Sequence, residues 1–128
     1  MNKLYAIKEF KHFGEKVIDW CVNKFGLSKY HEYDPWLDFE NDDLKMMGEY
    51  NIDENTITIY TNEIKNIDDL IETIIHEYVH YLQRPSWYTR YTNMGYEGVN
   101  NPYEMIAETI AINNWKQCKK EALNETNN

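Results

Sequence analysis

The stretch IIHEYVHYLQ, residues 74–83, governs how the rest of the sequence is interpreted. It contains two of the chain's four histidines, His76 and His80, and Glu77 directly follows the first of them. In a helix each residue turns the chain by ~100°, so residues four apart return to nearly the same face. His76 and His80 would therefore project side by side and could bind one metal ion, while Glu77 would lie just beside that face.

The residues around this stretch have the periodicity of an amphipathic helix. Apolar side chains recur at three- and four-residue steps from Ile67 to Leu82. Asn66 or Asp68 can cap the start of the helix, and Pro85 ends it. An H-E-x-x-H pattern on a helix is typical of zinc metallopeptidases, in which the glutamate is the general base. The alternative is a surface helix with two unrelated histidines, and the glutamate between them favours the metal site.

A third metal ligand has to come from elsewhere in the chain, since a catalytic zinc ion takes three protein ligands and leaves one position for water. The segment PYEMIAETIA, within a helix predicted over residues 102–122, offers carboxylates beside small alanines. Glu104 is the first candidate. Glu108, one turn later, is the runner-up, or it holds the ring N–H of a ligating histidine. Glu97 is a weaker third option.

The stretches HEYVHYLQ and NPYEMIAETIA together resemble a known family. They are similar to the gluzincin branch of zincin metallopeptidases, and most of all to small bacterial and phage-borne ones such as ImmA/IrrE-like peptidases and phage metallopeptidase-like proteins. The resemblance covers residues 56–115. It implies that His76 and His80 are zinc ligands, that Glu104 is the third ligand and that Glu77 is the catalytic base. It also implies a minimal zincin-like fold.

The remaining sequence predicts a single α+β domain over residues 1–128. We expect a small, mostly antiparallel sheet that carries a leading helix and the motif helix, with the last helix bringing the third ligand. The predicted elements are a helix over 4–25, a short strand near 36–39, a hairpin over 44–61 with a strand at 56–61, and a helix over 102–122.

The residues between the last two helices, 84–101, are predicted to form a long loop rich in tyrosine. Such a loop could close over a substrate or bind a partner protein. It also offers hydrogen-bond donors for the oxyanion of a tetrahedral intermediate. The residues considered for the oxyanion or for orienting the ligands are Tyr96, Tyr103, Gln83 and Glu108, with Tyr88, Tyr91, Arg84 and Arg90 as further donors. The strand at 56–61 could take an extended peptide along an exposed edge.

Composition excludes several classes of function. The net charge is −9 and the 13 Lys and Arg residues are scattered, which argues against a nucleic-acid ligand. No apolar run approaches the ~18 residues of a membrane-spanning helix. The first residues are charged, unlike a signal peptide, so we expect a cytoplasmic protein. In that compartment Cys21 and Cys118 are expected to be free thiols rather than a disulfide.

These patterns predict a zinc-dependent metallopeptidase that hydrolyses a peptide bond in a protein or peptide, using a metal-activated water and Glu77 as general base. The alternative is a catalytically inactive zinc-binding module that binds a partner through the tyrosine-rich segment 84–101. Glu77 separates the two hypotheses, because a purely structural zinc site has no need of a base.

Overall fold

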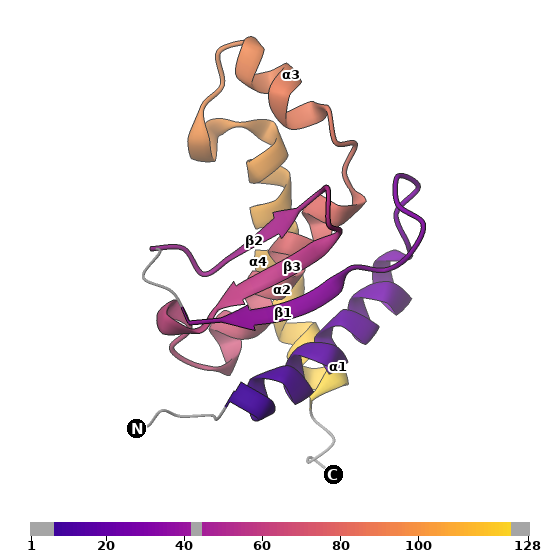
Figure 1. Ribbon diagram of the computed structural model, residues 1–128, viewed down its shortest axis with the longest axis vertical. Helices are drawn as coiled ribbons and strands as arrows, with labels where there is room; N and C mark the ends of the chain where they lie inside the picture. Colours follow the sequence, from indigo (N-terminus) through magenta and orange to yellow (C-terminus); the bar gives the residue numbers. More distant parts are fainter. Residues whose placement is uncertain (1–6, 42–44, 124–128) are drawn as a thin grey trace.

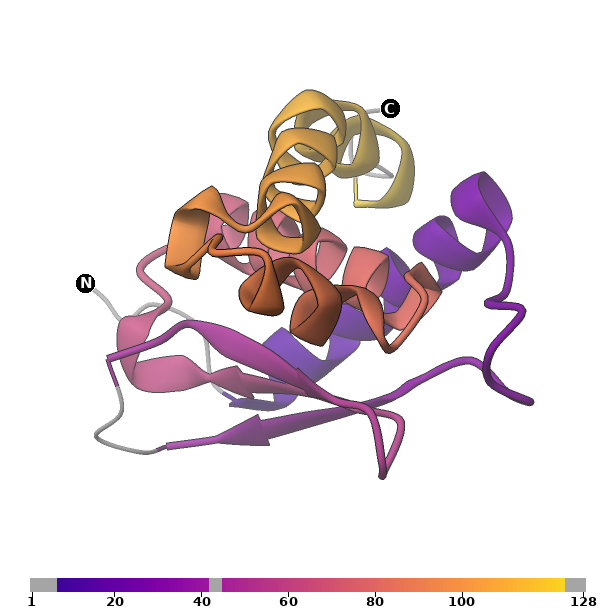
Figure 2. The same cartoon turned by 90° about the horizontal axis from the view of Figure 1, so that it is seen from above.

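The helix that carries both motif histidines, α2 (Ile67–Leu82), is the central element of the structure. The computed structural model describes residues 7–41 and 45–123 of the chain. Helix α2 packs against α1 (Ile7–Phe25), α4 (Pro102–Ala122) and the sheet. Figures 1 and 2 show the sheet as one layer, α1 and α2 as the next, and α4 on the far side of α2. Because it has neighbours on several sides, α2 is buried around most of its circumference.

The structure is α+β, and its sheet has three strands. They are β1 (Trp36–Glu40), β2 (Gly48–Asn51) and β3 (Thr56–Tyr60), in the order β1-β3-β2. The hairpin predicted over residues 44–61 is confirmed as β2 and β3, with residue 44 outside the described residues. The prediction of a mostly antiparallel sheet is wrong, because β1 pairs with β3 in parallel. A hairpin can be predicted from the local sequence, but the sequence does not show which of its two strands pairs with the third strand.

The position of β3 also corrects the expectation that this strand offers an exposed edge. Strand β3 lies in the middle of the sheet, with β1 hydrogen-bonded along one edge and β2 along the other. The open edge near α2 belongs instead to β2, which packs against that helix. Close packing there depends on Gly48, where an added Cβ would lie 2.9 Å from Thr73 Cγ2 and 3.0 Å from the Thr58 carbonyl oxygen.

Helix α1 follows its predicted range closely, with residues 4–6 outside the described part of the chain. It ends before Gly26, whose φ of +85° lies in the left-handed region that glycine adopts at low cost. Helix α1 packs closely on β1 at Gly14, where an added Cβ would lie only 2.7 Å from Leu37 Cδ2. In the described residues no helix combines the length and apolar character needed to cross a membrane.

The segment 84–101, predicted as a loop, contains a helix of its own. Helix α3 (Trp87–Asn93) and a short 3-10 turn, η2 (Gly98–Asn100), occupy most of it. With only 7 residues, α3 is too short to show a helical period in the sequence. Buried Asn101 fixes the segment, because its amide donates to the Tyr88 carbonyl and its Oδ1 accepts from the Tyr103 backbone N–H. Asn101 thus joins α3 to the first turn of α4.

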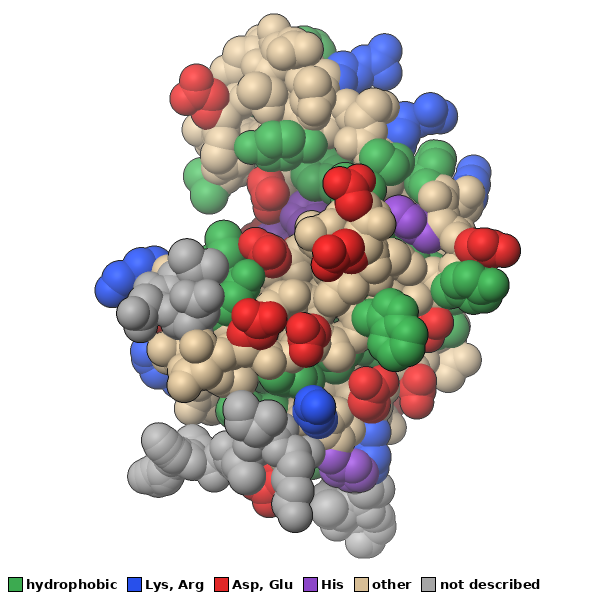
Figure 3. Space-filling view, viewed as in Figure 1, with side chains coloured by type: hydrophobic (Ala, Val, Ile, Leu, Met, Phe, Trp, Pro, Cys, Tyr) green, Lys and Arg blue, Asp and Glu red, His purple; other side chains and the backbone are tan. Residues whose placement is uncertain are grey.

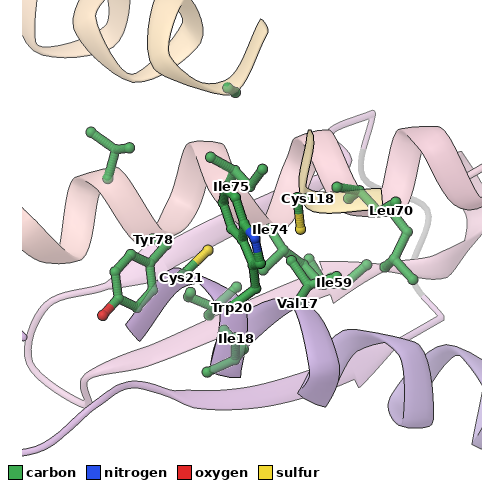
Figure 4. Packing of buried hydrophobic residues seen from close by; sticks show 14 of the residues in the cluster. Val17, Ile18, Trp20, Cys21, Ile59, Leu70, Ile74, Ile75, Tyr78 and Cys118 are labelled. Atoms are coloured by element: carbon green, nitrogen blue, oxygen red, sulfur yellow. The ribbon is translucent and has the colours of Figure 1, made fainter. Parts of the chain in front are cut away.

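The hydrophobic core lies between the sheet and the three long helices. Figure 4 shows Ile74 and Tyr78 of α2 among side chains of α1, with Ile59 of β3 on the same side. The Tyr78 ring is fully buried, and its hydroxyl donates to the Gly26 carbonyl at 2.6 Å. Both cysteines lie in this core as free thiols, as the sequence predicts.

We predict that neither Cys21 nor Cys118 reacts with iodoacetamide in the native protein. Burial raises the pKa of Cys118 to about 12 and also raises that of Cys21, so almost no reactive thiolate forms near neutral pH. Mass spectrometry across a urea titration should show labelling only as the protein unfolds. A Ser86→Cys variant, with a thiol at an exposed position, is the control and should label at once. Rapid native labelling of the wild type would contradict the packing.

Candidate metal centre

The two motif histidines are oriented by hydrogen bonds at the same ring atom. His76 Nδ1 lies 2.9 Å from Glu108 Oε1, and His80 Nδ1 lies 2.7 Å from Gln83 Oε1. A carboxylate and an amide oxygen can only accept, so each Nδ1 carries the hydrogen. Both rings therefore turn Nε2, the atom through which they would bind a metal ion, toward the Glu104 carboxylate between α2 and α4.

Glu104 of α4 completes the group. Its Oε1 atom lies 3.1 Å from His76 Nε2 and 3.1 Å from His80 Nε2. The three ligating atoms all lie within 4.8 Å of one another, so the group could hold a metal ion. Tetrahedral ligands at ~2.0–2.1 Å from a zinc ion are separated by roughly 3.3 Å, close to the two observed nitrogen–oxygen distances. The donor set of two imidazoles and one carboxylate is one that catalytic zinc sites use.

Glu104 reaches this position because α4 begins and packs in a defined way. Asn101 caps the helix, and Pro102 occupies its first turn, where a missing N–H costs nothing. Ala107 and Ala111 are fully buried on the side that faces the core. Side chains this small let the α4 axis come close to α2, as the sequence led us to expect, and Glu104 in the first turn can then reach both histidines.

His80 is held more firmly than His76. Its ring stacks on Tyr103 with centroids 4.4 Å apart and an interplanar angle of 11°. Gln83, which accepts from His80 Nδ1, also donates through Nε2 to the Tyr103 carbonyl at 3.0 Å. The side chain of His80 is only 7% exposed, against 20% for His76. Gln83 and Tyr103 thus fix the plane and the rotation of the His80 ring.

The charged groups of the centre stabilise positive charge. Burial disfavours protonation of His76, but hydrogen bonds and charges from Glu104, Glu77 and Glu108 outweigh it and raise the pKa of His76 to about 9. Hydrogen bonds from His76 and His80 lower the pKa of Glu104 to about 2. Positive charge is therefore stabilised at the point where the two Nε2 atoms and Glu104 meet.

Glu77 lies beside the ligands without joining them. It is 8% exposed, and none of the described residues forms a hydrogen bond with its side chain. Burial raises the pKa of this carboxyl, while the neighbouring charges of His80 and His76 act in the opposite direction. A carboxylate that is buried, unpaired and adjacent to the ligands has the environment of a proton acceptor.

Among the hollows that adjoin the centre, two are lined by both His76 and Glu77. The larger one, about 500 Å³, runs from β2 toward the start of α3, and Tyr50, Tyr88 and Tyr103 line it. The other, about 440 Å³, lies toward the first half of α2. Figure 3 shows histidine and acidic side chains exposed in the hollowed part of this face, below the surface formed by α3. A ligand lying across the centre would contact both hollows.

The structure brings together most of the residues that the sequence singled out. Glu108 contacts His76 Nδ1, which suits the role of orienting a ligand better than that of the third ligand. Tyr96, in contrast, is 43% exposed, packs against Tyr91 and lines neither hollow. Glu97 is exposed in the same segment.

Sequence reasoning missed several residues around the centre. Gly48, Glu49 and Tyr50 of β2 line the larger hollow, and Asp69 and Glu72 line the smaller one. Only the last pair had a readable signal, because Glu72 lies four residues before His76 and three after Asp69, on one face of the predicted helix. The edge position of β2 depends on the sheet order, which the sequence does not show.

The chain was compared with protein-family models, with curated proteins and with solved structures. No match was found in any of the three. The resemblance to gluzincins therefore stays a prediction, and the metal centre stands on the geometry of its own side chains.

We predict that the metal-free protein binds one divalent ion per chain, and that Glu104→Gln weakens binding by more than ~100-fold because it removes the charged ligand. Glu108→Gln should weaken it by only ~10-fold, since it disturbs the orientation of His76. Zinc titration by calorimetry, with circular dichroism to verify folding, measures both effects. Glu97→Gln is the control of equal charge change. Wild-type affinity in a folded Glu104→Gln protein would remove Glu104 from the centre.

Proposed function

We propose that the protein is a zinc-dependent metallopeptidase that hydrolyses a peptide bond in a protein or peptide. The supporting observation is the convergence of two imidazole Nε2 atoms and one carboxylate oxygen beside the buried carboxylate of Glu77. Structural zinc sites are usually closed by four protein ligands, whereas catalytic sites have three and an open position. Within the described residues the group has three members, which favours a catalytic centre.

The residues of the chain can divide the chemistry between them. His76, His80 and Glu104 would hold the zinc ion, which lowers the pKa of water to about 7 and polarises a carbonyl oxygen. Glu77 accepts a proton from the attacking water as the carbon–oxygen bond forms, and it returns that proton to the leaving amine as the carbon–nitrogen bond breaks. Its raised pKa helps the second half of this transfer.

Tyr103 is the best-placed donor for the oxyanion of the tetrahedral intermediate. Its hydroxyl forms no hydrogen bond within the described residues, and the residue lines the larger hollow. Burial, with the charges of Glu104 and Glu77, raises the pKa of Tyr103 to about 12, so the hydroxyl keeps its hydrogen near neutral pH. Stacking on His80 holds the ring next to the ligands.

The open edge of β2 provides a place for an extended substrate. A peptide that adds to an edge strand gains main-chain hydrogen bonds, and β2 borders the larger hollow through Gly48, Glu49 and Tyr50. The Tyr50 hydroxyl donates to Asn55 Oδ1 at 2.6 Å and lies 3.1 Å from His31 Nε2. These contacts keep the edge strand in place. A motif helix between a sheet and a glutamate-bearing helix supports a zincin-like fold for this chain.

The inactive binding module is the second candidate, and exposed apolar side chains in the segment 84–101 favour it. Met94 is 64% exposed and Val99 is 81% exposed. A partner protein could cover them. Glu77 argues for the enzyme, because a module that only binds zinc and a partner gains nothing from a buried, unpaired carboxylate.

We predict that Glu77→Gln retains zinc and loses at least ~10²-fold of its turnover, since the amide cannot accept a proton. Zinc-loaded wild type and variant are incubated with a complex peptide mixture, and the products are identified by mass spectrometry. Glu54→Gln, which removes an exposed carboxylate outside the centre, should behave as wild type. If neither wild type nor variant cleaves any peptide while both hold zinc, the binding module is the better description.

For Tyr103→Phe we predict a fall in kcat of about 100-fold with little change in KM, because the donor acts on the oxyanion rather than on the ground state. The ring stack on His80 is preserved, so zinc affinity should stay within about threefold of wild type. Steady-state kinetics measures the change in kcat and KM, and zinc titration measures the affinity. Tyr96→Phe serves as the matched control. An unchanged kcat would exclude the Tyr103 hydroxyl from the reaction.

A further inference from the structure

The smaller hollow beside the centre is strongly acidic. It has a volume of about 440 Å³ and opens from the first half of α2. Four of its lining residues carry carboxylates and none is Lys or Arg. The lining residues are Met47, Gly48, Asp69, Glu72, Thr73, His76, Glu77 and Glu108.

Among the described residues His76 pairs with Glu108, and no Lys or Arg side chain lines the hollow to neutralise its other carboxylates. Burial raises the pKa of Glu72. Both the charge of Glu108 and a hydrogen bond with Glu108 raise this pKa further. Asp69 acts in the same direction, and only His76 opposes them. At the floor, Glu77 is more than nine-tenths buried and has no hydrogen-bond partner among residues 7–41 and 45–123. A buried, unpaired acceptor next to two crowded carboxylates indicates a ligand that brings positive charge.

The occupant is better matched by a cationic side chain than by a second metal ion. In the described part of the chain the ligating atoms that cluster closely are those of His76, His80 and Glu104, and Asp69 and Glu72 are not among them. An Arg or Lys side chain needs no such close cluster. Its alkyl stem can lie along Met47 and Thr73 while its charged end reaches Glu72 and Glu108.

The larger hollow carries aromatic side chains that the smaller one lacks, and Glu49, Glu77 and Glu104 line it too. Tyr50, Tyr88 and Tyr103 line it together with Met46, Ile52 and Pro85. Because His76 and Glu77 border both hollows, a peptide bond placed at the centre would direct one flank toward the tyrosine side chains of the larger hollow and the other toward Glu72 and Glu108.

We propose that the substrate is a peptide segment with lysine or arginine on the side of the scissile bond that lies over Glu72 and Glu108. This inference rests on the proposed peptidase function and adds the substrate class. It assigns Glu72 to substrate recognition rather than to chemistry or to metal binding. Glu108 would contribute to substrate recognition but also forms a hydrogen bond with His76. A substitution of Glu72 therefore tests substrate recognition more directly.

The test compares peptides that differ at one position. Once a cleaved peptide is known, each position on both sides of the cleaved bond is replaced in turn by lysine, norleucine or glutamate. The zinc-loaded wild type should prefer lysine over norleucine by about tenfold in kcat/KM, at a position on one side only. Glu72→Gln should reduce this ratio to about twofold, and Glu72→Lys should favour glutamate there. Glu54→Gln, which makes the same charge change at an exposed site, should keep the wild-type ratio.

A binding measurement separates this inference from the peptidase itself. Zinc-loaded Glu77→Gln protein, with and without Glu72→Gln, is titrated with labelled, otherwise neutral peptides that differ only in carrying lysine, norleucine or glutamate at one central position, and binding is followed by fluorescence anisotropy. Cleavage without a charge preference, or a preference that Glu72→Gln leaves intact, overturns the inference and leaves the peptidase standing. Lysine-selective binding that depends on Glu72, without cleavage by the wild type, supports the acidic recognition site and overturns the peptidase. If the protein shows no cleavage and no selective binding, both the inference and the proposed peptidase function are overturned.

Discussion

The close approach of α4 to α2 is the contact on which the whole centre depends. His76 and His80 lie on α2, but the carboxylate that meets both of their Nε2 atoms comes from α4. Glu104 reaches them because Ala107 and Ala111, one and two turns further along, are fully buried. A larger side chain at either alanine would push the helices apart, and the cost would include both lost packing and lost convergence of the ligand atoms.

The same helix pair also orients the ligands, so packing and chemistry are coupled. Glu108 holds the Nδ1 atom of His76 from α4. Gln83, at the end of α2, holds Nδ1 of His80 and the carbonyl of Tyr103 in the first turn of α4. Each contact fixes a ring and also joins the two helices. A change that loosens the helix packing would therefore weaken the site even where it touches no ligand.

How much of this could be read from the sequence follows from how local each signal is. The helix around His76 and His80 is set by residues close in sequence and is confirmed, and Asn66 caps it, which is one of the two caps that the sequence predicts. The parallel pairing of β1 with β3, which leaves β2 at the open edge, depends on contacts between distant segments. Helix α3 was not predicted, because it is held in place by buried Asn101 and has no apolar periodicity of its own. Glu72 had the right spacing, but nothing local distinguishes it from a solvated helix face.

Unfavourable electrostatics occur beside the candidate metal centre. Glu72 and Glu108 crowd each other, and Glu77 is buried without a hydrogen bond in the described structure. Buried Asn101, in contrast, is paired with Tyr88 and Tyr103. Like charges held together at the cost of stability are expected where a bound ligand offsets them. A divalent ion between the histidines would offset the charge of Glu104 but would not contact Asp69 or Glu72 of the acidic hollow. Under the proposed function, a positively charged substrate side chain would offset these carboxylates.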